Sequence, residues 1–234
     1  MIDLSMRIRI LLTFPLLTFI GCEKEMEIED PIPEKQPPAM DTLRKQAVAG
    51  HAEAQMQLGE ILIGGPLEDR NETTGVMWLR LAAEQGLSSA QYALGESFLN
   101  GIGVTKDEDE AIKWLTLSAE QGKAMAQNVL GWVMANRGDG DDNFTAAVHW
   151  FRAAANQGYA VAQANLSTMY RDGKGVRRNK VLAYSWWEIA LEYTENIQSF
   201  HKKDGPNFNP TGEELKEIEW EKSKIRKTIN KKAK

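Results

Sequence analysis

The sequence predicts an all-α protein, a solenoid of four 36-residue helix-turn-helix repeats followed by a C-terminal capping helix. Tryptophan recurs at a constant step of 36 residues, at Trp78, Trp114, Trp150 and Trp186. A glycine that closes each unit and an Ala-Gln pair early in the next helix keep the same step. Within a unit, apolar residues recur every three or four positions, which indicates two helices. Such a period is typical of supersecondary units that stack on one another.

Residues 1–21 are predicted to be a signal peptide. The apolar run Ile10–Ile20 is too short to cross a hydrocarbon core of about 30 Å at about 1.5 Å per residue. Arg7 and Arg9 precede this run and a glycine follows it, which is the order of regions in an export signal. A chain begun at Met6 would have a better charged start than the first five residues provide.

Residues 22–40 are predicted to be an acidic, proline-rich linker. Seven carboxylate side chains between residues 23 and 41 face only two lysines, and four prolines lie between residues 31 and 38. Prolines at this density disfavour regular secondary structure and stiffen the chain. We therefore expect residues 23–40 to form a spacer without helices.

The four repeats are expected within residues 41–193. Paired glycines at Gly101 and Gly103 and at Gly173 and Gly175 should form the turn between the two helices of a unit. Small residues inside the first helix, at Gly59, Gly95, Gly131 and Ser167, indicate that a neighbouring helix approaches closely there. The third unit lacks the paired glycines over residues 135–142, so its loop is expected to be displaced. The repeated tryptophans are expected in the core.

Three stretches resemble known families. Leu-Ala-Ala-Glu-Gln-Gly at 81–86 and Ala-Gln-Tyr-Ala-Leu-Gly at 90–95 are similar to Sel1-like repeats, which are relatives of the tetratricopeptide repeat. This resemblance covers residues 41 to about 190 and implies a right-handed solenoid with a groove that docks proteins. Residues 19–22, Phe-Ile-Gly-Cys, resemble the lipobox of bacterial lipoproteins, which implies acylation of Cys22. Glu23 then implies an outer-membrane lipoprotein facing the periplasm, with a soluble periplasmic protein as the alternative.

Residues 194–234 are predicted to hold a linker, a capping helix and a basic tail. Thr211 and Glu214 should form a capping box, followed by an amphipathic run through Leu215, Ile218, Ile225 and Ile229. This helix would cover the apolar face that the last repeat leaves open. The last thirteen residues carry seven cations and no carboxylate side chain, and we expect them to be a solvated, mobile end.

Columns that vary between units are candidates for ligand binding. The columns of Glu53, Gln57 and Glu60 share one face of the first helix, opposite the invariant columns. Tryptophan stands in one of them where other units have polar residues, and an exposed tryptophan is a frequent binding anchor. The candidate groove residues are Trp132, Met125, Val129, Glu60, Glu96 and Gln57. In the alternative interpretation, Trp132 packs beneath the unusual loop of the third unit.

The sequence predicts a binding protein and not an enzyme. Its histidines, His51, His149 and His201, have no metal-ligand spacing, and we identify no catalytic, cofactor or metal residues. The net charge of −5 argues against nucleic-acid binding. We expect a scaffold or adaptor of the cell envelope that binds a protein ligand and reaches the membrane through lipidated Cys22. The alternatives are an immunity protein against a periplasmic toxic effector and a cell-wall hydrolase, and the oligomeric state is not indicated.

Overall fold

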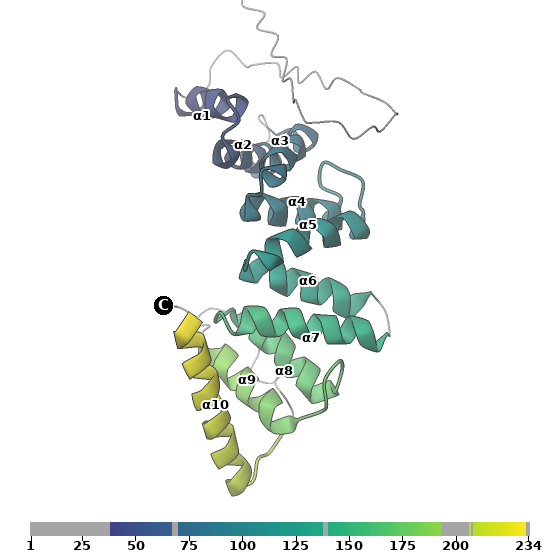
Figure 1. The fold of residues 1–234 in the computed structure, drawn as a ribbon, viewed down its shortest axis with the longest axis vertical. Helices are drawn as coiled ribbons and strands as arrows, with labels where there is room; N and C mark the ends of the chain where they lie inside the picture. The colour runs from purple at the N-terminus through teal and green to yellow at the C-terminus, as the bar shows by residue number, and fades with distance from the viewer. Residues whose placement is uncertain (1–37, 67–69, 138–139, 193–205, 207, 233–234) are drawn as a thin grey trace, which may run out of the picture. The chain divides into compact units, whose positions relative to one another are not determined.

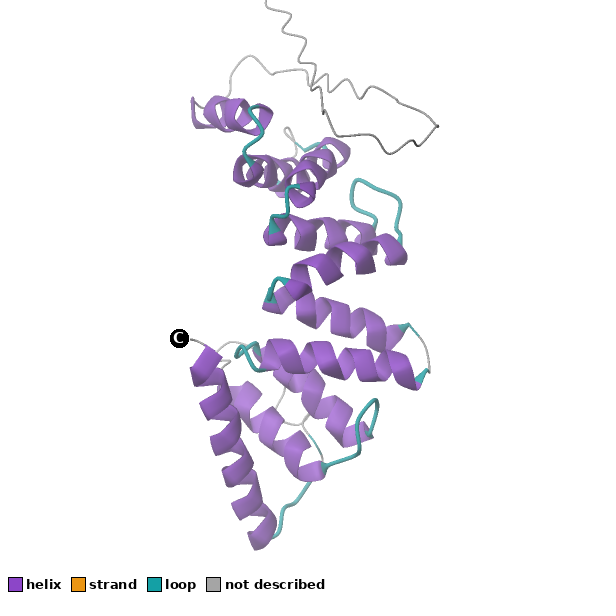
Figure 2. Ribbon diagram, in the orientation of Figure 1, coloured by secondary structure: helices purple, strands orange, loops and turns teal. Residues whose placement is uncertain are grey.

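The computed structural model describes residues 38–66, 70–137, 140–192, 206 and 208–232 (Figure 1). These residues form ten α-helices and no strand (Figure 2). The helices are α1 (Pro38–Val48), α2 (Ala52–Gly64), α3 (Glu72–Glu84), α4 (Ser88–Asn100), α5 (Glu108–Glu120), α6 (Ala124–Asn136), α7 (Asp141–Ala155), α8 (Ala160–Asp172), α9 (Lys180–Glu192) and α10 (Gly212–Lys232). The export signal, Met6 and Cys22 lie outside the described residues.

The helices pack as consecutive pairs, which confirms the predicted repeat. The most extensive contacts join α2 to α3, α4 to α5, α6 to α7 and α8 to α9. We call the first helix of each pair helix A and the second helix B. Successive units meet where a helix B packs on the next helix A, while α1 packs on α2 and α10 on α9. Each element therefore depends on its neighbours along the chain, as in other solenoids.

Small residues in helix A allow helix B of the same unit to approach. A β-carbon added at Gly95 would lie 2.7 Å from Cγ of Leu115, which is fully buried. The equivalent β-carbon at Gly131 would lie 2.8 Å from the ring of Phe151. In the fourth unit, Ser167 Oγ instead donates a 2.7 Å hydrogen bond to the backbone oxygen of Ala183. The glycine column thus exists because the helix-helix distance leaves no room for a side chain.

Buried glutamines of the Ala-Gln pairs connect each unit to the one before it. Gln91 Nε2 donates to the backbone oxygen of Ala83 on α3 (3.2 Å), and its Oε1 accepts from Gln121 Nε2 beyond α5 (2.7 Å). Gln55 and Gln127 make the same two kinds of bond. Each glutamine thereby holds three successive helices together and adds a second donor to a carbonyl that already accepts a backbone amide at the helix end.

The glycine loops of the second and fourth units dock on the preceding helix B. Gly103 has φ +65°, and a β-carbon there would lie 2.2 Å from the backbone oxygen of Glu72 at the start of α3. Gly175 has φ +63° and makes the equivalent approach to Phe144 on α7. Both the left-handed backbone and the close contact exclude any other residue. The paired glycines therefore terminate helix A and also join adjacent units.

The third unit joins its neighbour differently. Arg137 takes the place of the glycine loop and pairs with Glu108 (Nε–Oε1 3.3 Å) and with Asp109 at the start of α5. Helix α7 begins at Asp141, three residues before position 144, which the 36-residue step assigns as the equivalent of Glu108. The loop of the third unit thus differs from the others, as expected. The connection is shorter, and an ion pair replaces the glycine contact.

Three of the four repeated tryptophans lie in the core, as predicted. Trp78, Trp114 and Trp186 are buried. Trp150 is half-buried and packs at the edge of the core around α5 and α6, while its neighbour Phe151 is fully enclosed. The prediction that every tryptophan of this column is buried is therefore wrong for the third unit.

Helix α1 begins at Pro38, inside the segment 23–40 for which the prolines predicted no regular structure. Proline is favourable in the first turn of a helix because the amide hydrogen that it lacks would have no partner there. Ala47 of α1 is fully buried against the first unit. Residues 23–37 lie outside the described residues.

Helix α10 confirms the predicted cap and corrects the prediction of a mobile basic end. Thr211 and Glu214 form the capping box, with Thr211 N donating to Glu214 Oε2 (2.7 Å) and Glu214 N to Thr211 Oγ1 (3.4 Å). Ile218, Ile225 and Ile229 are buried, the last two in the core of the last units, while Leu215 is exposed. The helix continues to Lys232, so most of the basic end is regular structure that covers the open face of the repeats.

Two cations of this helix bind carboxylates of α9. Lys222 is buried, and its Nζ lies 3.5 Å from Glu188 and 3.6 Å from Glu192 of α9 and 3.0 Å from Glu219 of its own helix. Burial pushes the pKa of Lys222 down, but these carboxylates outweigh it and hold the pKa above its ordinary value. Arg226 binds Glu192 through both Nε and Nη2. The cap is therefore held by charge pairs as well as by the isoleucines.

Candidate functional site

The varying columns of the four A helices form one accessible surface, which we call the A-helix stripe. It contains the residues at positions 53, 57 and 60 of the first unit and their equivalents. Every side chain of the stripe is exposed or half-buried: Glu53, Gln57, Glu60, Ser89, Ala93, Glu96, Met125, Val129, Trp132, Val161, Asn165 and Thr168. The invariant leucines, at Leu58, Leu94, Leu130 and Leu166, are buried on the other side. Fixed columns thus build the core, and varying columns reach solvent.

Trp132 and Met125 are the most exposed apolar side chains of the stripe. Trp132 is 55% exposed and Met125 42%, and both lie on α6. Val129 stands between them in the helical register and is half-buried against the core. Among the described residues, the Trp132 ring has no aromatic or cationic partner. A tryptophan that packed beneath the adjacent loop would be enclosed, whereas more than half of the Trp132 side chain is exposed.

A polar network borders this apolar patch on the second unit. Lys123 Nζ donates to Ser89 Oγ (2.9 Å) and lies 5.6 Å from the centre of the Tyr92 ring. Burial, reinforced by a hydrogen bond to Glu96, raises the pKa of Tyr92. Tyr92 therefore remains protonated and able to donate. Sequence reasoning missed Tyr92 and Lys123, although the column that reads Met56, Tyr92, Asn128 and Ala164 varies as strongly as those of the stripe.

The far end of the stripe is neutral and internally bonded. Asn165 Nδ2 on α8 donates to Asn128 Oδ1 on α6 (3.0 Å), and Thr168 Oγ1 donates to the backbone of its own helix (3.2 Å). The first two units contribute the carboxylates Glu53, Glu60 and Glu96, and Lys123 adds one positive charge beside Ser89. Along the stripe, the surface thus changes from acidic through apolar to neutral.

The described residues hold no arrangement typical of a catalytic or metal site. They contain no group of three histidine, cysteine or acidic side chains that could hold a metal ion. Three carboxylates have lowered pKa values, and they lie on separate helices. Asp172 lies beside Arg171, Glu192 beside Arg226 and Lys222, and Glu214 at the start of α10. The converging pair of perturbed carboxylates that a hydrolase would need is not among them.

Two further features concern the membrane and the histidines. No helix in the described part of the chain is both long and apolar enough to span a bilayer. His51 and His149 are exposed and far apart in sequence, and His149 lies edge-on to Trp150 with ring centres 4.9 Å apart. Cys22 and His201 fall outside the described residues.

Comparison with known proteins identifies the repeat. The Sel1 repeat model matches residues 52–87, 88–123, 124–159 and 160–192, which coincide with the four helix pairs. No curated protein matches the chain.

Two solved structures resemble the fold. A protective antigen of uropathogenic Escherichia coli that displays an SLR fold is 35% identical, with a TM-score of 0.62 over 65% of this chain and 33% of the antigen. A Sel1 repeat protein from Oxalobacter formigenes is 25% identical, with a TM-score of 0.61 over 67% of this chain and 64% of that protein. The chain thus spans a third of the first relative and just under two thirds of the second. Because the repeat model covers more than half of its residues, the chain belongs to the Sel1 repeat family.

Proposed function

We propose that the protein is an interaction module whose A-helix stripe binds a segment of another protein, with Trp132 at the centre of the contact. The observation that carries this proposal is a tryptophan, 55% exposed, in a column that holds glutamate or threonine in the other units. Burying such a side chain against a partner contributes about 2 kcal/mol or more. Met125 and Val129 widen the apolar contact on the same helix.

The charges of the stripe define the ligand that fits it. Glu53, Glu60 and Glu96 lie on the two units that precede the tryptophan. A ligand with one or more basic residues next to an apolar or aromatic residue would complement both regions. Complementary charge speeds encounter and suppresses wrong partners, and apolar burial supplies most of the affinity. This ligand chemistry fits an envelope scaffold that recruits a basic partner and equally an immunity protein that neutralises a basic toxic effector.

The place of action is a separate proposal that rests on the N-terminal sequence. An export signal followed by Phe-Ile-Gly-Cys supports acylation of Cys22 and attachment to the outer membrane, facing the periplasm. The acidic, proline-rich residues after Cys22 would then separate the repeats from the lipid surface. Labelled palmitate should enter the wild-type protein and not Cys22→Ser, and the variant should move from the membrane fraction to the soluble periplasmic fraction.

Photo-crosslinking tests the stripe directly. A benzophenone amino acid at Met125 should capture a protein in cells, whereas the same group at Leu117 should not. Leu117 is a matched control because it is 39% exposed but lies on α5, a helix B outside the stripe. Equal capture from both positions, or none from Met125, would refute the proposed surface.

The captured protein separates the two versions of the proposal. An envelope component supports a scaffold. An effector that kills when directed to the periplasm, and that the wild-type protein but not Trp132→Ala neutralises, supports an immunity protein.

A further inference from the structure

Cations gather on the loop between helices α8 and α9 of the fourth unit. Residues 171–180 carry five basic side chains and one acid in a chain whose net charge is −5. Arg171 Nε binds the acid, Asp172, at 2.7 Å, and this hydrogen bond is the main reason that the pKa of Asp172 is lowered. Among the described residues, the guanidinium groups of Arg177 and Arg178 make no hydrogen bond. Asp172 also attracts Lys174 and Arg178, so within the described residues this segment has one acid against five cations and a net positive charge.

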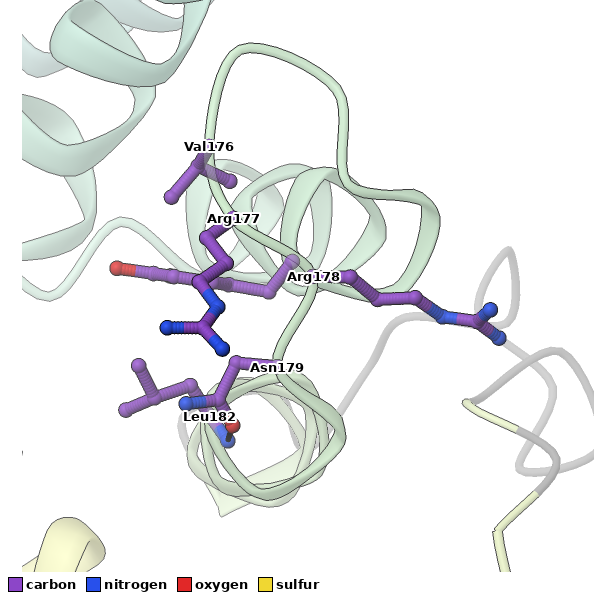
Figure 3. A pocket seen from close by; sticks show the side chains of 6 residues that line it. Val176, Arg177, Arg178, Asn179 and Leu182 are labelled. Atoms are coloured by element: carbon purple, nitrogen blue, oxygen red, sulfur yellow. Dashed lines mark hydrogen bonds between the residues drawn. The ribbon is translucent and has the colours of Figure 1, made fainter.

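Two of these cations, Arg177 and Arg178, border a cavity of about 360 Å³ (Figure 3). The cavity is lined by Tyr170, Val176, Arg177, Arg178, Asn179 and Leu182. In Figure 3, Arg177 points from the loop toward Asn179 and Leu182 at the start of α9, and Arg178 points away from them. We call this cavity the Arg177 pocket.

The lining combines hydrogen-bond donors with an apolar floor. Val176 and Leu182 are half-buried and pack against the core of the last two units. Asn179 Oδ1 caps α9 by accepting from Leu182 N (2.9 Å), which leaves its amide nitrogen available as a donor. Tyr170 OH already accepts from Arg152 Nη2 (2.9 Å). The pocket thus offers a planar guanidinium and an amide donor above aliphatic side chains, with no carboxylate in its lining.

The repeat itself does not require this arrangement. In the second unit, the equivalents of Arg177 and Leu182 are Thr105 and Glu110. The second unit therefore has a carboxylate where the fourth unit has the apolar Leu182. Glu110 Oε2 accepts a hydrogen bond from Trp114 Nε1 (3.2 Å). The loop glycines dock on the preceding helix in both units, whichever side chains stand at these positions. The cationic pocket is therefore a feature of the fourth unit and not of the fold.

We propose that the Arg177 pocket binds a glutamate or aspartate side chain of an acidic protein segment. A guanidinium matches a carboxylate with two parallel hydrogen bonds, and the apolar floor accommodates the aliphatic stem or a neighbouring apolar residue. Protein is the favoured carrier of this anion because the pocket sets a guanidinium over aliphatic side chains, whereas a nucleic acid would need a basic stripe that neutralises several phosphates. The pocket is independent of the A-helix stripe, whose charges select a basic ligand, so one protein would hold two oppositely charged segments.

A pair of labelled peptides tests this proposal on the full chain. The probe is fluoresceinated Leu-Glu-Leu-Glu-Leu, and its control has glutamine in place of glutamate. The wild-type protein should bind the glutamate peptide about tenfold more tightly than the control peptide, because hydrogen bonds to charged groups are the stronger ones. Arg177→Gln should abolish this preference. Leu182→Glu should abolish it too, since it places an internal acid in the pocket, as Glu110 does in the second unit.

Lys113→Gln is the matched control, because Lys113 is an exposed cation on α5 outside the pocket, and it should leave the preference unchanged. Equal binding of the two peptides, or a preference that survives both pocket variants, would overturn the proposal. Displacement of the peptide by millimolar inorganic phosphate would show a general anion site instead. Self-association of the wild-type chain that Arg177→Gln abolishes would make a second copy the occupant, which also contradicts it.

Discussion

Replacing Gly59 by alanine forces a methyl group into the close contact between α2 and α3 of the first unit. The new β-carbon would lie 2.8 Å from the backbone oxygen of Gly75 and 2.9 Å from Cγ of Leu79. A backbone oxygen within α3 can retreat only if the whole helix shifts. Such overpacking costs about 1–3 kcal/mol, and the contact with backbone places this site at the upper end. Alanine regains about 1 kcal/mol in helix propensity. The free energy of unfolding should therefore fall by about 1–2 kcal/mol.

Gly64→Ala is the matched control in the same helix. No atom beyond its own helical turn lies within 4 Å of the added β-carbon, so the substitution acts only through the smaller conformational entropy of the unfolded chain. This variant should be more stable than wild type by about 0.5 kcal/mol. Urea unfolding followed by circular dichroism at 222 nm measures both changes, and hydrogen exchange should place the loss for Gly59→Ala in α2 and α3. If Gly59→Ala proved as stable as Gly64→Ala, the close approach of the two helices would be refuted.

Two further predictions concern the junctions between units, and a third concerns the capping helix. Gln127→Leu should lower the free energy of unfolding by about 1–3 kcal/mol in urea melts, because it removes two side-chain hydrogen bonds of a buried residue, one to the carbonyl of Ala119 and one from Gln157 Nε2. Arg137→Ala should cost less than about 1 kcal/mol, because its ion pairs are exposed; a larger loss of thermal stability would mean that this loop does more than join two units. Burial raises the pKa of Glu192, but the hydrogen bond from Arg226 and nearby cations outweigh it and lower the pKa. Glu192 therefore contributes to the free energy of unfolding above its ordinary pKa of 4.5, and this contribution is lost as the pH falls through the lowered value. Acidification should reduce the urea midpoint more in wild type than in Arg226→Gln.

Periodicity was sufficient to predict the repeat and its core. The leucine column is buried in every unit, and the small column lies where helix B approaches, because both follow from residues that recur in register. The capping box at Thr211 and Glu214 could be predicted because its bonds are local in sequence. Repetition and local motifs therefore carry most of the fold.

Features that break the repeat could not be predicted in the same way. Trp150 is only half-buried although Phe151 fills the space against Gly131 as Leu115 does against Gly95 in the second unit, so no residue of the repeat pattern reveals this difference. Arg137 replaces a glycine contact with an ion pair to a residue 28 or 29 positions away, which no local pattern reveals. Likewise, the buried Lys222 belongs to a capping helix only because the isoleucines beside it pack on α7 to α9.

The candidate site was predicted in outline. The exposed stripe follows from the variation between units, and Trp132 from its departure from its column. The network of Tyr92, Glu96 and Lys123 required the structure, because it joins side chains of two successive units.

The most direct test of the account is the affinity of the crosslinked partner for three purified proteins: wild type, Trp132→Ala and Trp220→Ala. The two tryptophans are matched in exposure, at 55% and 59%, but Trp220 lies on α10, outside the A-helix stripe. The account predicts that Trp132→Ala weakens binding about 30-fold, equivalent to about 2 kcal/mol, while Trp220→Ala leaves it unchanged and both variants keep the helical circular dichroism of wild type. Equal affinity of wild type and Trp132→Ala, or a loss confined to Trp220→Ala, would contradict the claim that the stripe is the ligand-binding surface.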